Sequence, residues 1–347
     1  MGLLLDGSLV EPVARGLLGS ISCSGGPTVE QRRLLQALLN HLWERPDLRV
    51  SALEPIAPEE LAAALDDLPT RRAAHLLQMT LEFCRHPQTD AQLALGWAYA
   101  EALGVSSAVL EVSRDWLRQG VDQAAADVGR IFTTFLPLRS EPGLADPLAS
   151  GDQPEPALVA RIEGFAQLPE ASLGRALLVY YDRFGFPLPG RDACALNHLY
   201  LAHDMTHVIA GIAATSAGEI ALSAFQWAMQ DNPINESALL ASLVTHEAGF
   251  VSANPTLAPD HSSLDSPSAA YLLASELKRG SACSADFSLV DHFALAPLAV
   301  IGGAAAVQRV PAPSAQLGGS PVLGGRGVSS SFLSPPRLWF LWLRRRP

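Results

Sequence analysis

The chain has 347 residues, enough for two domains of ordinary size and a sizeable hydrophobic core. Apolar residues make up 48% of the sequence and charged residues 17%, which is typical of a folded protein and argues against general disorder. The formal net charge of −11 argues against a nucleic-acid-binding protein, because such proteins carry a basic surface. Six arginines and no acidic residue follow Asp291, so an acidic body is expected to precede a basic tail.

The cysteines and the N-terminal residues indicate the cellular compartment in which the protein is expected. The four cysteines are far apart and form no Cys-x-x-Cys pair, which argues against a disulfide framework or a cysteine-ligated zinc site. Asp6 and Glu11 come too early for a signal peptide. The longest uncharged apolar stretch, 293–307, contains Pro297 and is shorter than the roughly 20 residues of a membrane span. We therefore expect a cytoplasmic protein, at most peripheral at the inner face of the membrane.

The first part of the chain predicts a bundle of helices. Thr28 and Gln31 form a capping-box pattern, which predicts a helix running to about Glu44. Pro58 begins an acidic, proline-led helix start. Leucine and alanine recur at three- and four-residue steps, which predicts further helices over 70–84, 90–103 and 106–127. One short run, 131–138, has the alternation of a strand.

The second part again predicts helices. Residues 137–156 are rich in proline, glycine and acids, a composition typical of a linker. Helical periodicity then returns over 157–167, 172–183, 193–210, 217–230, 235–250 and 267–279. The helices at 193–210 and 217–230 are apolar on nearly all sides, which is typical of the centre of a bundle. The predicted fold is all-α, with helical domains at 1–136 and 157–300, the linker at 137–156 and a low-complexity tail at 301–347.

Three interpretations of the tail remain open. Its content of Gly, Pro, Ser and Arg favours a disordered segment. The aromatic run 338–342 before three arginines would also suit a membrane-surface anchor. A reading-frame error in the sequence would produce a similar composition. No catalytic role is assigned to the tail.

The strongest functional signal is His203-Asp204-x-x-His207, followed after eleven residues by Glu219. At 100° per residue the first three side chains fall on one arc of a helix and can converge. Imidazole nitrogens and carboxylate oxygens together suit zinc or a similar divalent ion. Gly211 breaks the helix and lets the next one bring Glu219 back. We therefore predict a metal site with His203, Asp204, His207 and Glu219 as ligands.

These residues also have ordinary roles to be weighed. Ser216 and Glu219 match a capping box, in which Glu219 would only cap a helix. His203 and His207 could be hydrogen-bonded core histidines, which is the commoner role of a lone buried histidine. Their joint occurrence at ligand spacing favours the metal site.

The other histidines give weaker signals. His246-Glu247 begins a zinc-protease pattern, but Phe250 stands where the second histidine is required. The pair Asp291-His292 has no visible partner. Four more histidines lack an acid or histidine at ligand spacing and are expected to be structural or solvated: His41, His75, His86 and His198.

The pattern His203-Asp204-x-x-His207-x11-Glu219 resembles the signature of the fourth protein of the coenzyme Q biosynthesis pathway, here called the Coq-four family. The similarity covers about 157–250, including Leu168-Pro169-Glu170-Ala171-Ser172-Leu173-Gly174-Arg175 and Gly218-Glu219. The chain looks like a divergent bacterial member. The segment before the linker is loosely similar to helical tellurite-resistance domains, and the basic tail replaces sequence that is folded in the family.

The resemblance implies an all-helical protein that binds a divalent metal, usually zinc, through the four motif residues. It also implies action on a prenylated aromatic lipid beside other quinone-biosynthesis enzymes, at a membrane face. The expected function is metal-dependent decarboxylation of a polyprenylated hydroxybenzoate. From their position beside the preceding helix, Arg175 and Arg183 are candidates for the substrate carboxylate, with surface solvation as the commoner role for either arginine.

Two other functions remain open at this point. The chain could be a non-catalytic, lipid-binding scaffold with a structural zinc, or a metal-dependent hydrolase that shares only the ligand spacing. A closed four-ligand shell would favour the scaffold, and an open coordination position would favour catalysis. The sequence names no catalytic residue beyond the ligands, and self-association is left open.

Overall fold

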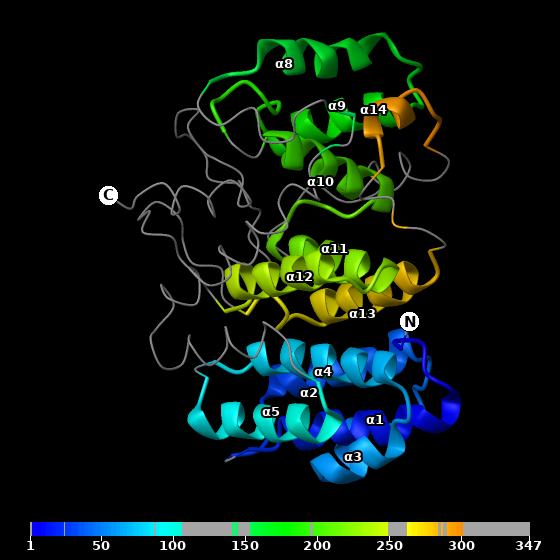
Figure 1. Cartoon of the computed structure of the whole chain (residues 1–347), viewed down its shortest axis with the longest axis vertical. Coiled ribbons are helices and arrows are strands. Elements are labelled where there is room, and N and C mark those ends of the chain that lie inside the picture. Colours follow the sequence, from blue (N-terminus) through cyan, green and yellow to red (C-terminus); the bar gives the residue numbers. More distant parts are fainter. Residues whose placement is uncertain are drawn as a thin grey trace.

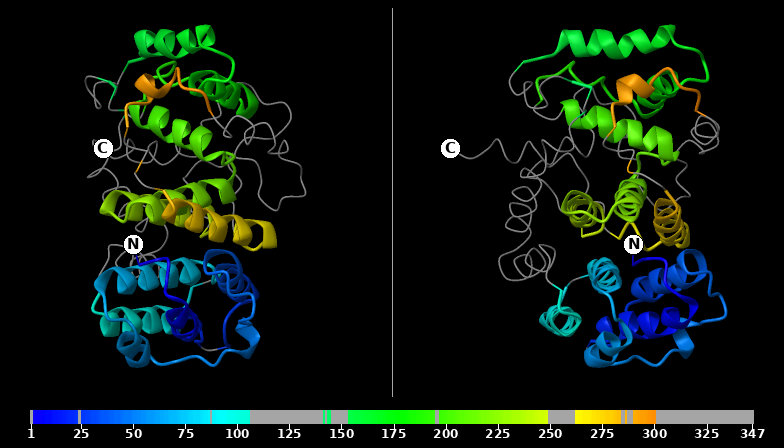
Figure 2. Two further views of the ribbon diagram at one scale, coloured as in Figure 1. Left: turned by 90° about the vertical axis from the view of Figure 1, so that its right-hand side faces the viewer. Right: turned by 45° about the vertical axis from the view of Figure 1, so that its right-hand side comes forward.

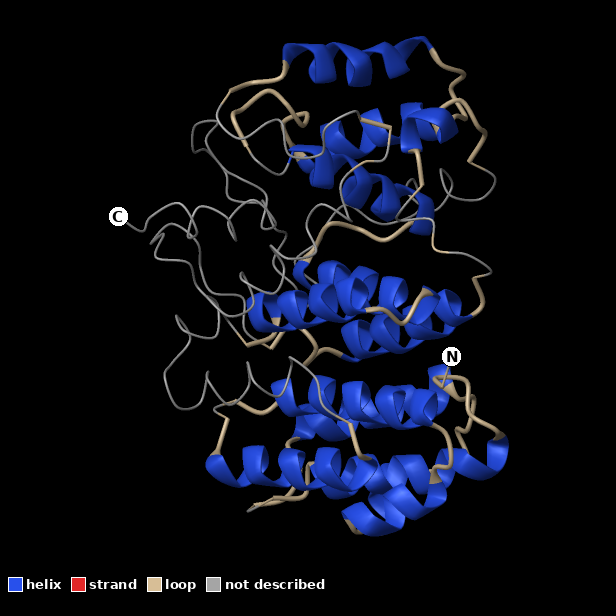
Figure 3. Ribbon diagram, in the orientation of Figure 1, coloured by secondary structure: helices blue, strands red, loops and turns tan. Residues whose placement is uncertain are grey.

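The computed structural model describes residues 2–23, 25–86, 88–105, 141, 143–144, 153–194, 197–248, 262–283, 286 and 290–300. These residues form helices, turns and loops without a strand, so the predicted all-α fold is confirmed for this part of the chain (Figure 3). The expected helix 106–127, the strand-like run 131–138, most of the linker and the tail lie outside the described residues.

The N-terminal helices begin largely where the sequence places them. They are α1 (Gly7–Ser20), α2 (Val29–Ala37), the π-helical turn η1 (Leu38–Leu42), the 3-10 turn η2 (Val50–Ala52), α3 (Pro58–Ala64), α4 (Leu68–Phe83) and α5 (Asp90–Leu103). The capping box before α2 is confirmed, because the Gln31 amide donates to Thr28 Oγ1 at 3.0 Å and the Thr28 amide donates to Gln31 Oε1 at 2.9 Å. Helix α1 was not expected; Asp6 caps it by accepting from the Ser8 amide.

The second half contains α8 (Pro156–Glu163), the 3-10 turn η3 (Gly164–Gln167), α9 (Leu173–Phe184), α10 (Asn197–Ala210), α11 (Ser216–Met229), α12 (Pro233–His246), α13 (Pro267–Ser281) and α14 (His292–Leu295). Helices α10 and α11 are buried along nearly their whole length, as their uniformly apolar sequences predict. None of the described helices combines the length and the apolar character that a membrane crossing requires.

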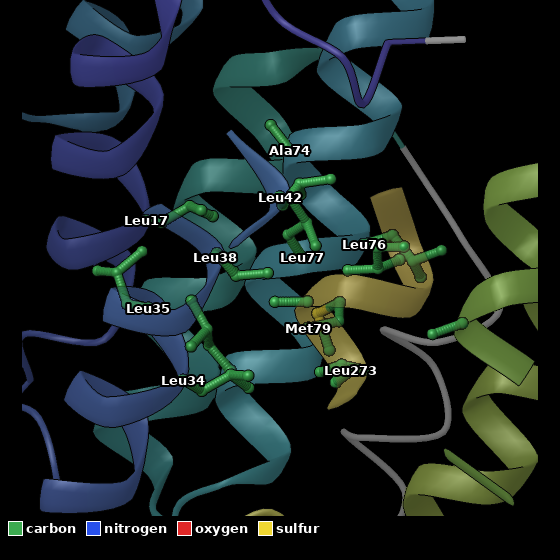
Figure 4. Packing of buried hydrophobic residues seen from close by; sticks show 14 of the residues in the cluster. Leu17, Leu34, Leu35, Leu38, Leu42, Ala74, Leu76, Leu77, Met79 and Leu273 are labelled. Atoms are coloured by element: carbon green, nitrogen blue, oxygen red, sulfur yellow. The ribbon is translucent and has the colours of Figure 1, made fainter. Parts of the chain in front are cut away.

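The helices are stacked in layers. Figures 1 and 2 show α11, α12 and α13 between the N-terminal helices on one side and the pair α9–α10 on the other. The largest hydrophobic cluster joins side chains of α1, α2 and α4 to side chains of α11, α12 and α13. In Figure 4, Leu273 of α13 lies beside Met79 of α4, and Leu76 of α4 belongs to the same cluster. Hydrophobic contacts therefore join residues that precede the predicted linker at 137–156 to residues that follow it. The role of this segment as a domain boundary stays a prediction.

A second hydrophobic cluster positions α10. Leu201, Met205 and Val208 on one face of α10 pack with Leu177 and Tyr181 of α9. The chain then turns at Gly211, whose φ of 71° is a left-handed conformation that glycine adopts without steric cost. This turn brings the first turn of α11 back alongside the end of α10.

Candidate metal centre

Three of the predicted ligands meet between α10 and α11. The Nε2 atoms of His203 and His207 lie 3.2 Å apart. Glu219 places Oε2 at 3.1 Å from His203 Nε2 and Oε1 at 3.3 Å from His207 Nε2. The ligand atoms of the three residues all lie within 4.8 Å of one another. The spacing of four residues on α10 and the turn at Gly211 therefore produce the convergence that the sequence predicts.

The orientation of His207 is fixed by the backbone. Its Nδ1 lies 3.0 Å from the carbonyl oxygen of Ile212, an arrangement in which Nδ1–H donates to that carbonyl. A proton on Nδ1 leaves the lone pair of the neutral ring on Nε2, the atom that faces Glu219 and His203. A metal-binding histidine commonly makes this kind of outer hydrogen bond to a backbone carbonyl.

The electrostatics of the site depend on burial and on the paired charges. Burial favours the neutral form of His207, but the neighbouring Glu219 outweighs it and raises the pKa of His207 above its ordinary value. Burial also acts to raise the pKa of Glu219, but His207 and His203 outweigh it and hold the pKa well below its usual range. The carboxylate is therefore ionised, as a metal ligand must be.

The ordinary explanation of Glu219 as a helix cap is wrong. Thr215 is the N-cap of α11, and its side chain accepts from the Gly218 amide at 3.1 Å. The predicted cap, Ser216, is already the first helical residue, and Glu219 is four residues after the actual cap, Thr215, one position too far along for a capping box. The Glu219 side chain instead contacts the two histidines.

Asp204, the fourth predicted ligand, lies outside the three-residue group. It is buried, and its Oδ2 accepts a 2.9 Å hydrogen bond from the hydroxyl of Tyr181 on α9. Its negative charge nevertheless contributes to the raised pKa of His207. In this arrangement Asp204 supports the site electrostatically from beside it, and its coordination of a metal stays a prediction.

Tyrosines on α9 form a wall of the site that the sequence did not reveal. The ring of Tyr180 stacks on His207, with centroids 5.7 Å apart and planes inclined by 26°. Burial, followed by the charges of Asp204 and Glu219, raises the pKa of Tyr180 well above its ordinary value, so the hydroxyl stays neutral. That hydroxyl is buried without a hydrogen-bond partner in the described part of the chain. In the sequence, the only indication of this wall was that Tyr180 and Tyr181 lie on the helix that precedes the motif.

The two arginines considered for a substrate carboxylate make other contacts. Arg175 donates to the carbonyl oxygen of Ala166 at 3.0 Å. The guanidinium carbon of Arg183 lies 5.8 Å from the centre of the Phe184 ring. A role for either arginine in binding a substrate stays a prediction.

Some of the other histidines have acidic partners that are distant in sequence. His86 Nε2 lies 2.9 Å from Glu247 Oε1, and His292 Nδ1 lies 2.7 Å from Glu141 Oε2. His198 pairs with Glu155. Spacing along one helix could not reveal these partners, and the pairing of His86 and His198 with distant acids agrees with the structural role expected for them.

The residues His203, His207 and Glu219 fit a divalent cation. Two imidazole nitrogens and a carboxylate face one another at 3.1–3.3 Å, and lone pairs so close repel unless a proton or a cation lies among them. Nitrogen and oxygen donors in this mixture suit zinc and similar ions.

The chain matches no family model, no curated protein and no solved structure.

Proposed function

We propose that His203, His207 and Glu219 bind a divalent cation, zinc being the first candidate. One observation carries this proposal: three donor atoms from two helices lie within 4.8 Å of one another in a largely buried site. The outer hydrogen bond from His207 to Ile212 supports it, because that bond leaves Nε2 available as a ligand.

We further propose that the chain decarboxylates a polyprenylated hydroxybenzoate in ubiquinone biosynthesis, as the motif resemblance implies. In this reaction the bond between the ring carbon and the carboxylate carbon breaks, carbon dioxide leaves, and the ring carbon takes a proton from solvent. A divalent cation, when bound, stabilises negative charge on a substrate oxygen. The hydrogen bond from Tyr181 to Asp204 supports catalysis over a closed structural site, because a cation held by His203, His207 and Glu219 alone would have a position left for substrate.

The residues in and around the site have separate roles in the proposed reaction. His207 and Glu219 are almost fully buried and hold the inner side of the site, whereas the side chain of His203 is 17% exposed and marks its open side. Tyr180 excludes water by stacking on His207. The prenylated substrate places the proposed activity at the inner face of the membrane, beside the enzymes that supply and consume the lipid.

The test uses a polyprenylated hydroxybenzoate with a ¹³C-labelled carboxylate and the full chain loaded with zinc. Mass spectrometry of the gas phase should detect labelled carbon dioxide with the wild type and with the control His41→Ala. His207→Ala should release it only at the background rate. Zinc-loaded wild type that retains the lipid without releasing carbon dioxide would show that the chain is a scaffold and that the catalytic proposal is wrong.

A further inference from the structure

A second group of ligand-type side chains lies at the junction of three helices. Glu30 comes from the first turn of α2, His86 from the segment after α4, and Glu247 from the end of α12. One ligand atom from each residue lies within 4.8 Å of the other two. The three residues are distant in the sequence, so only the packing of α12 against the N-terminal helices brings them together.

The contacts within this group orient its atoms. His86 Nε2 lies 2.9 Å from Glu247 Oε1, and the backbone amide of Leu264 donates to Glu247 Oε2 at 2.9 Å. The Leu264 amide therefore fixes the Glu247 carboxylate with its other oxygen toward His86. An outer hydrogen bond of this kind is what usually orients a carboxylate that binds a metal.

The group is buried and lacks positive charge. Glu30 is 7% exposed and the side chain of Glu247 is fully buried, while the side chain of His86 is 26% exposed and gives access from solvent. Oε1 of Glu30 is buried without a hydrogen-bond partner among the described residues. The charged groups that act on Glu30 are Glu247, His86 and Asp265, and none of these is a lysine or arginine.

Two buried carboxylates beside a neutral imidazole are costly without a compensating charge. A proton on one carboxyl group would remove half of the formal charge of −2, whereas a divalent cation would remove all of it. The cation would also give Glu30 Oε1 the partner that it lacks.

We propose that Glu30, His86 and Glu247 form a second site for a divalent metal ion, of the borderline class that includes Zn²⁺ and Co²⁺. One imidazole and two carboxylates suit these ions. The bound ion links α12 to α2 and to the end of α4, so its role is to stabilise the contact between the two halves of the chain. This site shares no residue with the one at His203, His207 and Glu219.

The competing explanation is a proton shared between Glu30 and Glu247. Burial, the charge of Glu247 and a side-chain hydrogen bond with Glu247 raise the pKa of Glu30 to about 9 in the metal-free state, so the proton would be present at neutral pH. Glu30→Gln distinguishes the two explanations, because the amide keeps the shape and neutrality of a protonated carboxyl group and removes an anionic ligand.

The experiment counts bound ions in the full chain. His203→Ala removes a ligand of the first site and serves as the background. The demetallated protein is dialysed against Zn²⁺ and analysed for its metal content. The His203→Ala chain should keep one ion, the added Glu30→Gln should weaken zinc binding at least about tenfold, and the added control His41→Ala should leave it unchanged.

A second measurement keeps the proposal testable if Glu30→Gln fails to fold. His86→Ala, at a partly exposed position, should remove the same ion, and Zn²⁺ should then no longer raise the unfolding temperature in the His203→Ala background. Equal zinc content and equal thermal shifts with and without these substitutions would overturn the second site and favour the shared proton. The first site is tested separately by Glu219→Gln, so failure of one site is distinguishable from failure of the other.

Discussion

The hydroxyl of Tyr181 donates a 2.9 Å hydrogen bond to Oδ2 of Asp204, and both side chains are buried between α9 and α10. Tyr181→Phe removes this donor without changing the shape of the ring. The Asp204 carboxylate then loses a hydrogen bond, and we expect the free energy of unfolding to fall by about 1–3 kcal/mol. Urea unfolding measures the change. Tyr271→Phe, at an exposed position on α13, is the control and should have an effect below about 0.5 kcal/mol.

Glu219→Gln tests the first metal site. The amide keeps the shape of the side chain but lacks the negative charge that stabilises a bound cation, so zinc affinity at this site should fall at least about tenfold. Elemental analysis after dialysis against Zn²⁺ in the Glu30→Gln background measures this site alone. Glu163→Gln, which alters an exposed ion pair with Arg191, is the matched control. Undiminished zinc content in the Glu219 variant would contradict the assignment.

Much of the fold followed from local sequence signals. The capping box of Thr28 and Gln31 gave the start of α2, and Pro58 stands at the first position of α3. The uniformly apolar sequences of α10 and α11 correctly predicted burial. Helix α1 was missed, because its interior contains Pro12, a residue that usually ends a helical pattern.

The first site was partly predictable because its ligands are close in sequence. His203 and His207 are one helical turn apart, and Glu219 follows after a single turn of the chain. The contact between Asp204 and Tyr181 depends on how α9 packs on α10, which spacing along one helix cannot reveal. For the same reason the group of Glu30 and Glu247 was invisible, since more than two hundred residues separate its members.

Gly280 allows α13 to pack closely on α11. A Cβ atom at this position would lie 2.2 Å from the carbonyl oxygen of Phe225, an atom of the α11 backbone that cannot move aside easily. Gly280→Ala should therefore lower the free energy of unfolding by about 1–3 kcal/mol. Gly164→Ala is the control, because a Cβ there meets no atom within 4 Å, and it should be neutral or slightly stabilising. Equal stability of the two variants by urea unfolding would contradict this packing.

Glu82 should make stability depend on pH. Its side chain is fully buried against α5, and burial raises its pKa to about 8. Between about pH 4.5 and pH 8 the folded state keeps a proton that the unfolded state releases, so stability falls as the pH rises, by about 1.4 kcal/mol per pH unit. Glu82→Gln has no such proton. The stability of the wild type relative to this variant should decrease from pH 5 to pH 8 in urea titrations, and a constant difference would contradict the prediction.

The shared core of the N-terminal helices and α13 has a consequence for synthesis on the ribosome. Leu76 and Met79 leave the ribosome long before Leu273, their partner in the same cluster. At about 5–20 residues per second, the interval lasts on the order of 10–40 s. During this time a newly made chain exposes apolar side chains whose partners do not yet exist, and it is then most vulnerable to aggregation.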